Sequence, residues 1–155
     1  MAVIGRALRS ELNRARVAHF ASSTGKRPSL VPVCFVLIGD TAYHALDAKP
    51  KAVGARQLAR VKNVRANPNA ALLIDHYQEN WNRLWYVMIH GRARVLERGA
   101  EHRRAIVALK RKYPQYRTTV PLSGEALVIA LDAGRLSHWR ASSSGHRGGR
   151  RGSPA

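Results

Sequence analysis

Residues 25–46 read GKRPSLVPVCFVLIGDTAYHAL and alternate turn signals with runs of β-branched residues. A Gly-Lys-Arg-Pro turn opens the segment, residues 29–38 form the first apolar run, and a Gly-Asp turn leads into residues 41–46. Such runs between tight turns predict antiparallel strands, and a further strand is expected just before them, over residues 20–24. Pro32 cannot donate a backbone hydrogen bond, so its strand must have an edge, a bulge or a ligand at that position.

The rest of the chain adds helices and further strands around this meander. Apolar residues at helical spacing predict helices over residues 5–19, 55–67 and 101–112. Apolar and alternating runs predict strands over residues 69–77, 84–97, 125–132 and 135–140. Short turns between the strands, with helices only at the connections, predict a mainly β fold: a closed antiparallel barrel with peripheral helices.

Length and composition set the broad class of protein. The chain has 155 residues, of which 45% are hydrophobic, and this fits one domain with a sizeable core. We expect that domain over residues 1–140 and a disordered Gly/Arg-rich tail over residues 141–155. A single cysteine forms no disulfide within the chain, and no Cys/His cluster has zinc spacing. With no apolar run of membrane-spanning length and no signal-peptide pattern, we expect a soluble cytoplasmic protein without a metal or a membrane partner.

The charge is strongly positive, with 27 Lys and Arg against 9 Asp and Glu and a formal net charge of +18. Such a balance favours an anionic partner: a nucleic acid, a membrane surface, or a small molecule that carries phosphates and carboxylates. The tail after Ala141 holds three arginines and no acidic residue, so most of the charge belongs to the domain itself.

The segment from Ala48 to Ile74 concentrates this charge, because it contains basic residues and no acidic one. Its basic residues are Lys49, Lys51, Arg56, Arg60, Lys62 and Arg65. The two lysines lie in a loop directly after a strand, and Arg56 and Arg60 share one face of the following helix. A strand end, a lysine loop and a helix start together suggest a phosphate cradle. A solvated helix face is the alternative interpretation.

Several motifs occur in an order that resembles the pyridoxamine-phosphate-oxidase-like split-barrel superfamily. They are Gly25 to Phe35, Asp47-Ala-Lys-Pro-Lys51, Arg60 to Pro68, Asp75-His-Tyr77 and Trp81 to Val87. The resemblance spans about residues 6–140 and looks most like the branch of deazaflavin (coenzyme F420)-dependent oxidoreductases. It implies a six-stranded FMN-binding type of split barrel that forms a homodimer, with cofactor sites at the subunit interface.

The resemblance also implies which residues of this chain bind the cofactor. The strand residues beside the isoalloxazine-like ring would be Val31, Pro32, Val33 and Cys34. The residues that hold the cofactor phosphate would be Lys49, Lys51 and Arg60, with Arg56 assisting. Tyr86 and Trp139 would border the ring. The pattern that pyridoxamine phosphate oxidase itself resembles has basic residues on the strand that corresponds to Leu30 to Phe35. In this chain the strand is apolar, so we do not expect vitamin B6 oxidation.

The implied chemistry is hydride transfer between the reduced deazaflavin and a small unsaturated organic substrate. The charge favours F420 over FMN, because F420 carries a phosphodiester and several carboxylates, whereas FMN needs one phosphate pocket. Only charges within roughly 10 Å of the ligand contribute to this preference. We assign no catalytic residue; His76, Tyr77 and Tyr86 are candidate proton donors.

Three other functions are open at this point. The same barrel could use FMN. A basic nucleic-acid-binding module, with the Gly/Arg tail as a non-specific anchor, would show a steep salt dependence of binding. A barrel that stores or senses a cofactor would bind it without turnover.

Overall fold

The computed structural model describes residues 1–46 and 54–142, with the backbone alone for residues 54–58. Its strands are β1 (Ala18–Ser23), β2 (Pro28–Val33), β3 (Val36–Ile38), β4 (Thr41–Ala45), β5 (Asn69–His76), β6 (Trp85–Leu96) and β7 (Val128–Arg140). Its helices are α1 (Arg6–Leu12), α2 (Gly54–Ala66) and α3 (Ala100–Lys112), with short 3-10 turns η2 (Trp81–Arg83) and η3 (Pro114–Arg117). Within these residues, no helix is long and apolar enough to cross a membrane.

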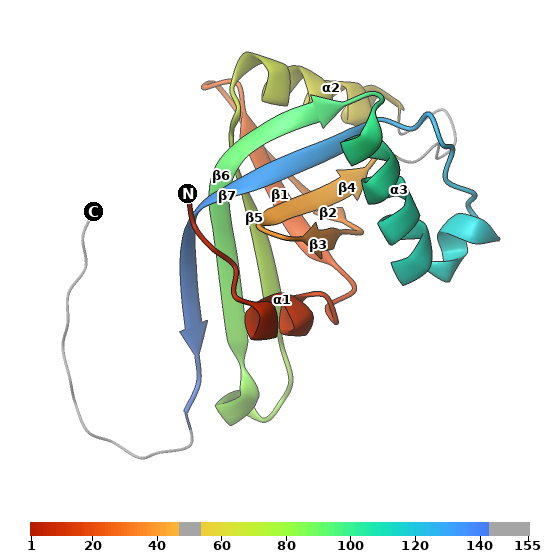
Figure 1. Cartoon of the computed structure of the whole chain (residues 1–155). Helices are drawn as coiled ribbons and strands as arrows, with labels where there is room; N and C mark the ends of the chain where they lie inside the picture. Colours follow the sequence, from red (N-terminus) through yellow and green to blue (C-terminus); the bar gives the residue numbers. More distant parts are fainter. Residues whose placement is uncertain (47–53, 143–155) are drawn as a thin grey trace.

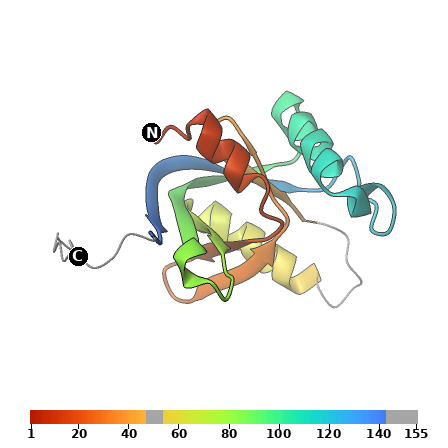
Figure 2. The ribbon, with the colours of Figure 1, turned by 90° about the horizontal axis from the view of Figure 1, so that it is seen from below.

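The strands form one curled antiparallel sheet in the order β2-β1-β5-β6-β7-β4-β3 (Figure 1). A view from below separates α1 and α3 from α2 across the strands (Figure 2). The two edge strands, β2 and β3, are consecutive in the chain, and only Cys34 and Phe35 lie between them. No hydrogen-bonded ladder between described residues joins β2 to β3, so the curled sheet is a split barrel. At this corner the two edge strands are joined only by the two residues between them.

A buried tyrosine fixes the corner between β2 and β3. The Phe35 backbone N–H donates a 3.0 Å hydrogen bond to the Tyr113 hydroxyl, which lies 2.9 Å from the Arg16 carbonyl oxygen. The Phe35 ring is fully buried, and the Lys112 ammonium lies 3.8 Å from its centroid. Because a buried backbone donor without a partner is costly, this hydroxyl stabilises the turn of the chain.

The core lies inside the curl of the sheet. Side chains that alternate along the strands, such as Phe20, Leu72 and Ile89, point inward and are buried. Val61 and Val64 pack α2 against this cluster, and a second cluster holds α3 through Ala105, Ile106 and Leu109. Each large side chain buried in this way contributes roughly 1.5–3 kcal/mol.

The opposite face of strands β2, β1, β5, β6 and β7 is not covered by any described element. We call it the outer face, and its members by register are Leu30, Pro32, His19, Leu73, Asp75, Met88, Tyr86 and Trp139. Leu30 is 69% exposed, Trp139 48% and Tyr86 38%, which is high for side chains of this size. A large apolar surface of this kind typically receives a partner or a ligand.

The mainly β split barrel is confirmed, with corrections. The closed barrel predicted from the residue pattern is wrong, because no ladder between described residues joins β2 to β3. The described residues form seven strands, whereas the resemblance implied six. The run predicted over residues 29–38 is divided into β2 and β3 at the corner. The helix predicted over residues 5–19 ends at Leu12. The Asn13 side chain exchanges two hydrogen bonds with the backbone of Leu37, of 2.8 and 3.0 Å, and this tertiary contact ends the helix.

The two strands predicted at the C-terminal side of the domain are one strand, β7. It continues through Ala133-Gly134, where its register with β6 shifts between His90 and Gly91. A Cβ atom at Gly91 would collide with the Asp132 carbonyl oxygen, so glycine allows the two backbones to approach and the strand to continue. The tail predicted after Ala141 lies mostly outside the described residues.

Candidate functional site

A pocket of about 190 Å³ opens beside the corner between β2 and β3, and we call it the corner pocket. Its lining residues are Val17, Pro32, Val33, Cys34, Ala45, Arg60 and Tyr116. They come from the ends of β2 and β4, from α2, from η3 and from the segment before β1. The structure therefore brings together three of the predicted ring-side residues and one of the predicted phosphate-binding residues.

Arg60 lies at the margin of the buried face of α2 and lines the corner pocket. Val61 and Val64 are buried against the sheet, and this leaves the half-buried Arg60 side chain at the pocket. A guanidinium offers a fork of donors that matches phosphate or carboxylate oxygens. Arg56 lies one helical turn earlier on α2, and its side chain is outside the description. Lys49 and Lys51 fall outside the described residues.

A buried histidine lies near Arg60, and the sequence interpretation missed it. His44 on β4 is 3% exposed, and its ring centroid lies 4.6 Å from that of Phe20. Burial, and then the positive charge of Arg60, hold the pKa of His44 well below its ordinary value. Its Nε2 atom is buried and has no hydrogen-bond partner among the described residues. This is a neutral imidazole with an unused polar atom, beside a cation.

The other predicted ring-side residues lie apart from the corner pocket. The half-buried Val31 packs against the core instead. Tyr86 and Trp139 are cross-strand partners on β6 and β7, with ring centroids 6.4 Å apart at an interplanar angle of 25°. They line a second pocket of about 210 Å³ with Trp85 and Arg140 among its other members. Tyr86 and Trp139 lie on the same outer face as Pro32 but line a different pocket. Within one chain, these three residues therefore do not surround a single ligand.

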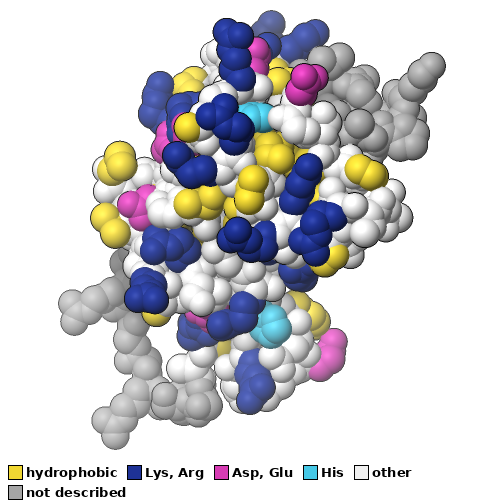
Figure 3. All heavy atoms as spheres, turned by 45° about the vertical axis from the view of Figure 1, so that its right-hand side comes forward, with side chains coloured by type: hydrophobic (Ala, Val, Ile, Leu, Met, Phe, Trp, Pro, Cys, Tyr) yellow, Lys and Arg dark blue, Asp and Glu magenta, His cyan; other side chains and the backbone are white. Residues whose placement is uncertain are grey.

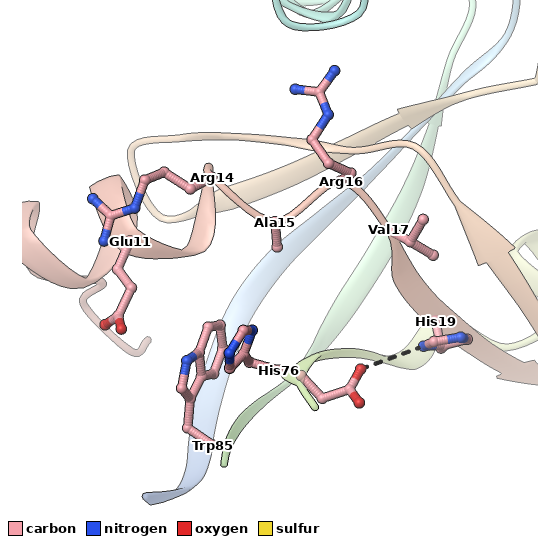
Figure 4. A pocket seen from close by; sticks show the side chains of 9 residues that line it. Glu11, Arg14, Ala15, Arg16, Val17, His19, His76 and Trp85 are labelled. Carbon is pink, nitrogen blue, oxygen red and sulfur yellow. Dashed lines mark ion pairs between the residues drawn. The ribbon is translucent and has the colours of Figure 1, made fainter. Parts of the chain in front are cut away.

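A third pocket, of about 600 Å³, lies at the ends of β1, β5 and β6, and we call it the His19 pocket (Figure 4). It is lined by Glu11, Arg14, Ala15, Arg16, Val17, His19, Asp75, His76 and Trp85. The Nδ1 atom of His19 lies 4.0 Å from the Asp75 carboxylate. The rings of His76 and Trp85 are stacked with centroids 6.0 Å apart. Val17 lines this pocket and the corner pocket, so the two are neighbours.

The positive charge is spread more widely than the sequence suggested. Arg60 is the one basic side chain that the described residues contribute to the corner pocket. A groove along α3 contains Arg103, Arg104 and Arg111, with the exposed Val107 between them. Figure 3 shows many Lys and Arg side chains over one face of the molecule, with few acidic ones. Much of the net charge is therefore general surface charge.

A cluster of ion pairs centred on Arg94 joins β6, α3 and β7. The Arg94 guanidinium donates to Glu101 at 2.8 and 3.0 Å and to Asp132 at 2.6 and 2.9 Å. These hydrogen bonds lower the pKa of both carboxyls and raise that of Arg94. Burial, with a hydrogen bond to Glu101, raises the pKa of Tyr43 to about 12. The described residues contain no group of His, Cys, Asp and Glu that could hold a metal ion.

The sequence of this chain matches a known protein family over most of its length. The sequence model described as pyridoxamine 5'-phosphate oxidase matches residues 6–137, which is most of the chain. The chain belongs to this family. Proteins of this family are often oxidoreductases, and the split barrel is the family's fold. A comparison with curated proteins gave no match.

Solved structures share the fold at low sequence identity. A conserved hypothetical protein of Mycobacterium tuberculosis superposes with a TM-score of 0.66 at 17% identity, covering 88% of this chain and 85% of that one. An FAD-binding protein of Mesorhizobium loti gives 0.64 at 15% identity, with 88% and 95% covered. The heme storage protein HutZ of Vibrio cholerae gives 0.64 at 12% identity, with 87% and 93% covered. The same fold thus occurs in proteins with different ligands.

Proposed function

We propose that the protein is an oxidoreductase that binds coenzyme F420 at a homodimer interface and transfers a hydride to or from a small unsaturated organic substrate. The observation that supports this most is the convergence of Pro32, Val33 and Cys34 with Arg60 at the corner pocket. An apolar strand end suits the flat ring of a deazaflavin, and a guanidinium suits its phosphodiester.

The residues present fit such a cofactor. Arg60 would hold the phosphate at the corner pocket. Lys49, Lys51 and Arg56 would add charge for the carboxylates of the tail. The bound cofactor would supply the two-electron chemistry, while the chain would orient it, balance its charge and exclude water. The apolar strand from Leu30 to Phe35 argues against vitamin B6 as the substrate.

The homodimer is proposed from the outer face. Leu30, Tyr86 and Trp139 are too exposed for an isolated subunit, and the half-buried Leu73 and Met88 extend the apolar surface between them. A second copy that packs on these apolar side chains, with His19 and Asp75 at the rim of the contact, would bury them and place its own Tyr86 and Trp139 near the partner's ring site. This would explain why one chain alone does not bring Pro32 and Trp139 around one ligand.

Two other functions have support from particular observations. FMN carries one phosphate, and among the described residues one basic side chain lines the corner pocket. FMN therefore remains the alternative cofactor in the same site. Storage of a cofactor without turnover is the second alternative, because a heme storage protein has this fold.

The test is to purify the full chain from a host that makes both flavin and deazaflavin cofactors, and to measure the visible spectrum and mass of the ligand that copurifies. We expect F420, and in titrations of the ligand-free protein we expect tighter binding of F420 than of FMN. If FMN binds more tightly than F420, FMN replaces F420 as the proposed cofactor. A bound cofactor that no unsaturated substrate oxidises or reduces would favour storage.

A further inference from the structure

We propose that the His19 pocket receives the organic substrate, that this substrate is planar and conjugated and carries a carboxylate, and that His19 gives it a proton while Asp75 positions the imidazole. This inference rests on the proposed hydride transfer and assigns the substrate class and the proton donor for it. The pocket of about 600 Å³ has room for a small aromatic molecule.

The pocket lies beside the proposed cofactor site. Val17 lines both pockets, and His19 is the cross-strand partner of Pro32 in the β1–β2 ladder. Partners that lie directly opposite in an antiparallel pair have their side chains on the same face of the sheet. His19 and the ring-side residue Pro32 are therefore neighbours on the outer face, and a substrate near His19 would lie beside the cofactor ring.

A stacked aromatic pair gives the pocket a flat wall. The planes of His76 and Trp85 differ by 17°, and the Arg140 guanidinium lies 5.6 Å from the Trp85 centroid. Figure 4 shows the two rings side by side in the pocket. Trp85 is half-buried and packs against the core, so its ring is held in place. Rigid aromatic surfaces of this kind favour a planar, conjugated ligand.

Among the arginines that line the pocket, Arg16 has a partner in the described residues, and Arg14 is the one that can bind an anion. Glu11 is neutralised by a 2.7 Å ion pair with Arg140. The Arg16 side chain donates to the Lys112 carbonyl oxygen at 3.0 Å and lies over the Tyr113 ring. Arg14 makes no ion pair or side-chain hydrogen bond to another described residue. Its guanidinium is thus available to a carboxylate of the substrate.

His19 combines a covered nitrogen with an accessible ring. Its Nδ1 atom is buried, makes no hydrogen bond and faces Asp75 at 4.0 Å, while 40% of its side chain is exposed. The dashed line in Figure 4 marks this pair. A carboxylate on the Nδ1 side favours a proton there and leaves Nε2 to exchange a proton with a ligand. The ionisable groups around His19 in the pocket are Asp75 and His76 of β5, Glu11 of α1, and Arg14 and Arg16 from the segment that follows α1.

The step balances as a net addition of two hydrogens to a carbon–carbon double bond. The bound deazaflavin would supply a hydride that forms a C–H bond at one alkene carbon, and the π electrons would move to the adjacent carbon. The Nε2–H bond of His19 would break, and its proton would form the second C–H bond. The substrate gains two electrons, the cofactor loses two, and His19 regains its proton from water.

The first experiment measures binding of trans-cinnamate, a planar unsaturated carboxylate, to the full-length protein without cofactor. We expect cinnamate to perturb the Trp85 indole signal in NMR spectra and Arg14→Gln to weaken its affinity about tenfold or more. Arg98→Gln, an exposed arginine outside the pocket, is the matched control and should change little. Absence of a response at Trp85, or an equal loss in both variants, would overturn the substrate assignment.

The second experiment follows the His19 ring nitrogens by ¹⁵N NMR. We expect cinnamate to shift the Nε2 signal, and Asp75→Asn to redistribute the imidazole tautomers, whereas the exposed Glu79→Gln should not. With reduced F420 and cinnamate, His19→Gln should slow cofactor oxidation about 100-fold while cinnamate affinity changes less than twofold.

Two results would contradict the role of His19. A His19 ring that does not respond to bound cinnamate, or a His19→Gln variant as fast as the unmodified protein, would remove the proton donor. Cofactor oxidation that cinnamate does not stimulate in the unmodified protein would remove the substrate class. Because cinnamate binding is measured without cofactor and F420 binding without cinnamate, failure of this inference is distinguishable from failure of the proposed function.

Discussion

The Tyr113 hydroxyl accepts a hydrogen bond from the backbone N–H of Phe35 at 3.0 Å and so fixes the corner where the two edges of the sheet meet. The Tyr113 and Tyr116 rings are in edge contact, with centroids 5.7 Å apart, and Tyr116 lines the corner pocket. The contact therefore links the C-terminal side of α3 to the strand end that carries the proposed cofactor site.

Removing this hydroxyl should destabilise the protein. Tyr113→Phe leaves the buried Phe35 N–H without its partner, and we expect the free energy of unfolding to fall by about 1–3 kcal/mol. Urea denaturation measures this value. Tyr77→Phe removes a hydroxyl from an exposed ring and should be neutral. Equal stability of the two variants would show that the Tyr113 hydroxyl does not hold the corner.

The close approach of β6 and β7 predicts an intolerant glycine. Gly91→Ala places a Cβ atom against the Asp132 carbonyl oxygen, so the strands must separate. We expect a loss of about 1–3 kcal/mol in thermal or denaturant unfolding. Gly124→Ala meets open space at an ordinary backbone conformation and should cost much less. A Gly91→Ala variant as stable as Gly124→Ala would contradict the described register.

The clamp around Arg94 predicts a particular acid sensitivity. Its hydrogen bonds lower the pKa of Glu101 and Asp132, so their contribution to stability is present above the ordinary carboxyl values of 4.5 and 3.8. This contribution is lost as pH falls through the lowered values. Arg94→Gln should cost about 1 kcal/mol at neutral pH, since these side chains are partly exposed, and should flatten the dependence below about pH 5.

A matched control exists for the clamp. Arg65 pairs with Glu97 at 2.7 Å, but both side chains are more than half exposed. Arg65→Gln should change the free energy of unfolding by less than about 0.5 kcal/mol. If both arginine variants have the same stability from neutral to acidic pH, the Arg94 cluster is an ordinary surface contact.

The buried His44 predicts a second pH dependence in a different range. Because its pKa is lowered in the folded state, the unfolded chain binds a proton first as pH falls below the ordinary value of 6.5. Stability should therefore be full above that value and should fall as pH drops below it, by at most roughly 1.4 kcal/mol per pH unit. His44→Leu should remove this slope whatever its stability at neutral pH. A slope that is unchanged in the variant would assign it to other groups.

The fold could be predicted from the sequence because its signals are local. Alternating burial along β1 and β-branched runs between turns follow directly from the residue pattern. The end of α1 could not be predicted in this way, because the Asn13 side chain forms hydrogen bonds with the backbone of Leu37, which lies far along the chain. Nor could the break between β2 and β3, which depends on Tyr113.

The site was predicted in part. The neighbourhood of Cys34 and Arg60 followed from the family resemblance, and the structure brings these residues to one pocket. His44 and His19 were missed for different reasons. A polar residue in an apolar strand was the available signal for His44, whereas His19 was placed on a helix that ends at Leu12. The His19 pocket forms only when α1, β1, β5 and β6 come together, so no local sequence pattern predicts it.

We propose that Arg60 and the strand end at Cys34 form the binding site of a deazaflavin. The most direct measurement is the dissociation constant of F420 for the ligand-free protein, Arg60→Ala and Lys62→Ala, an exposed lysine on the same helix. Loss of a charge-assisted phosphate contact should weaken binding by about 1.5–3 kcal/mol in Arg60→Ala, with little change in Lys62→Ala. Equal affinity in all three proteins, with the fold intact, would contradict the site.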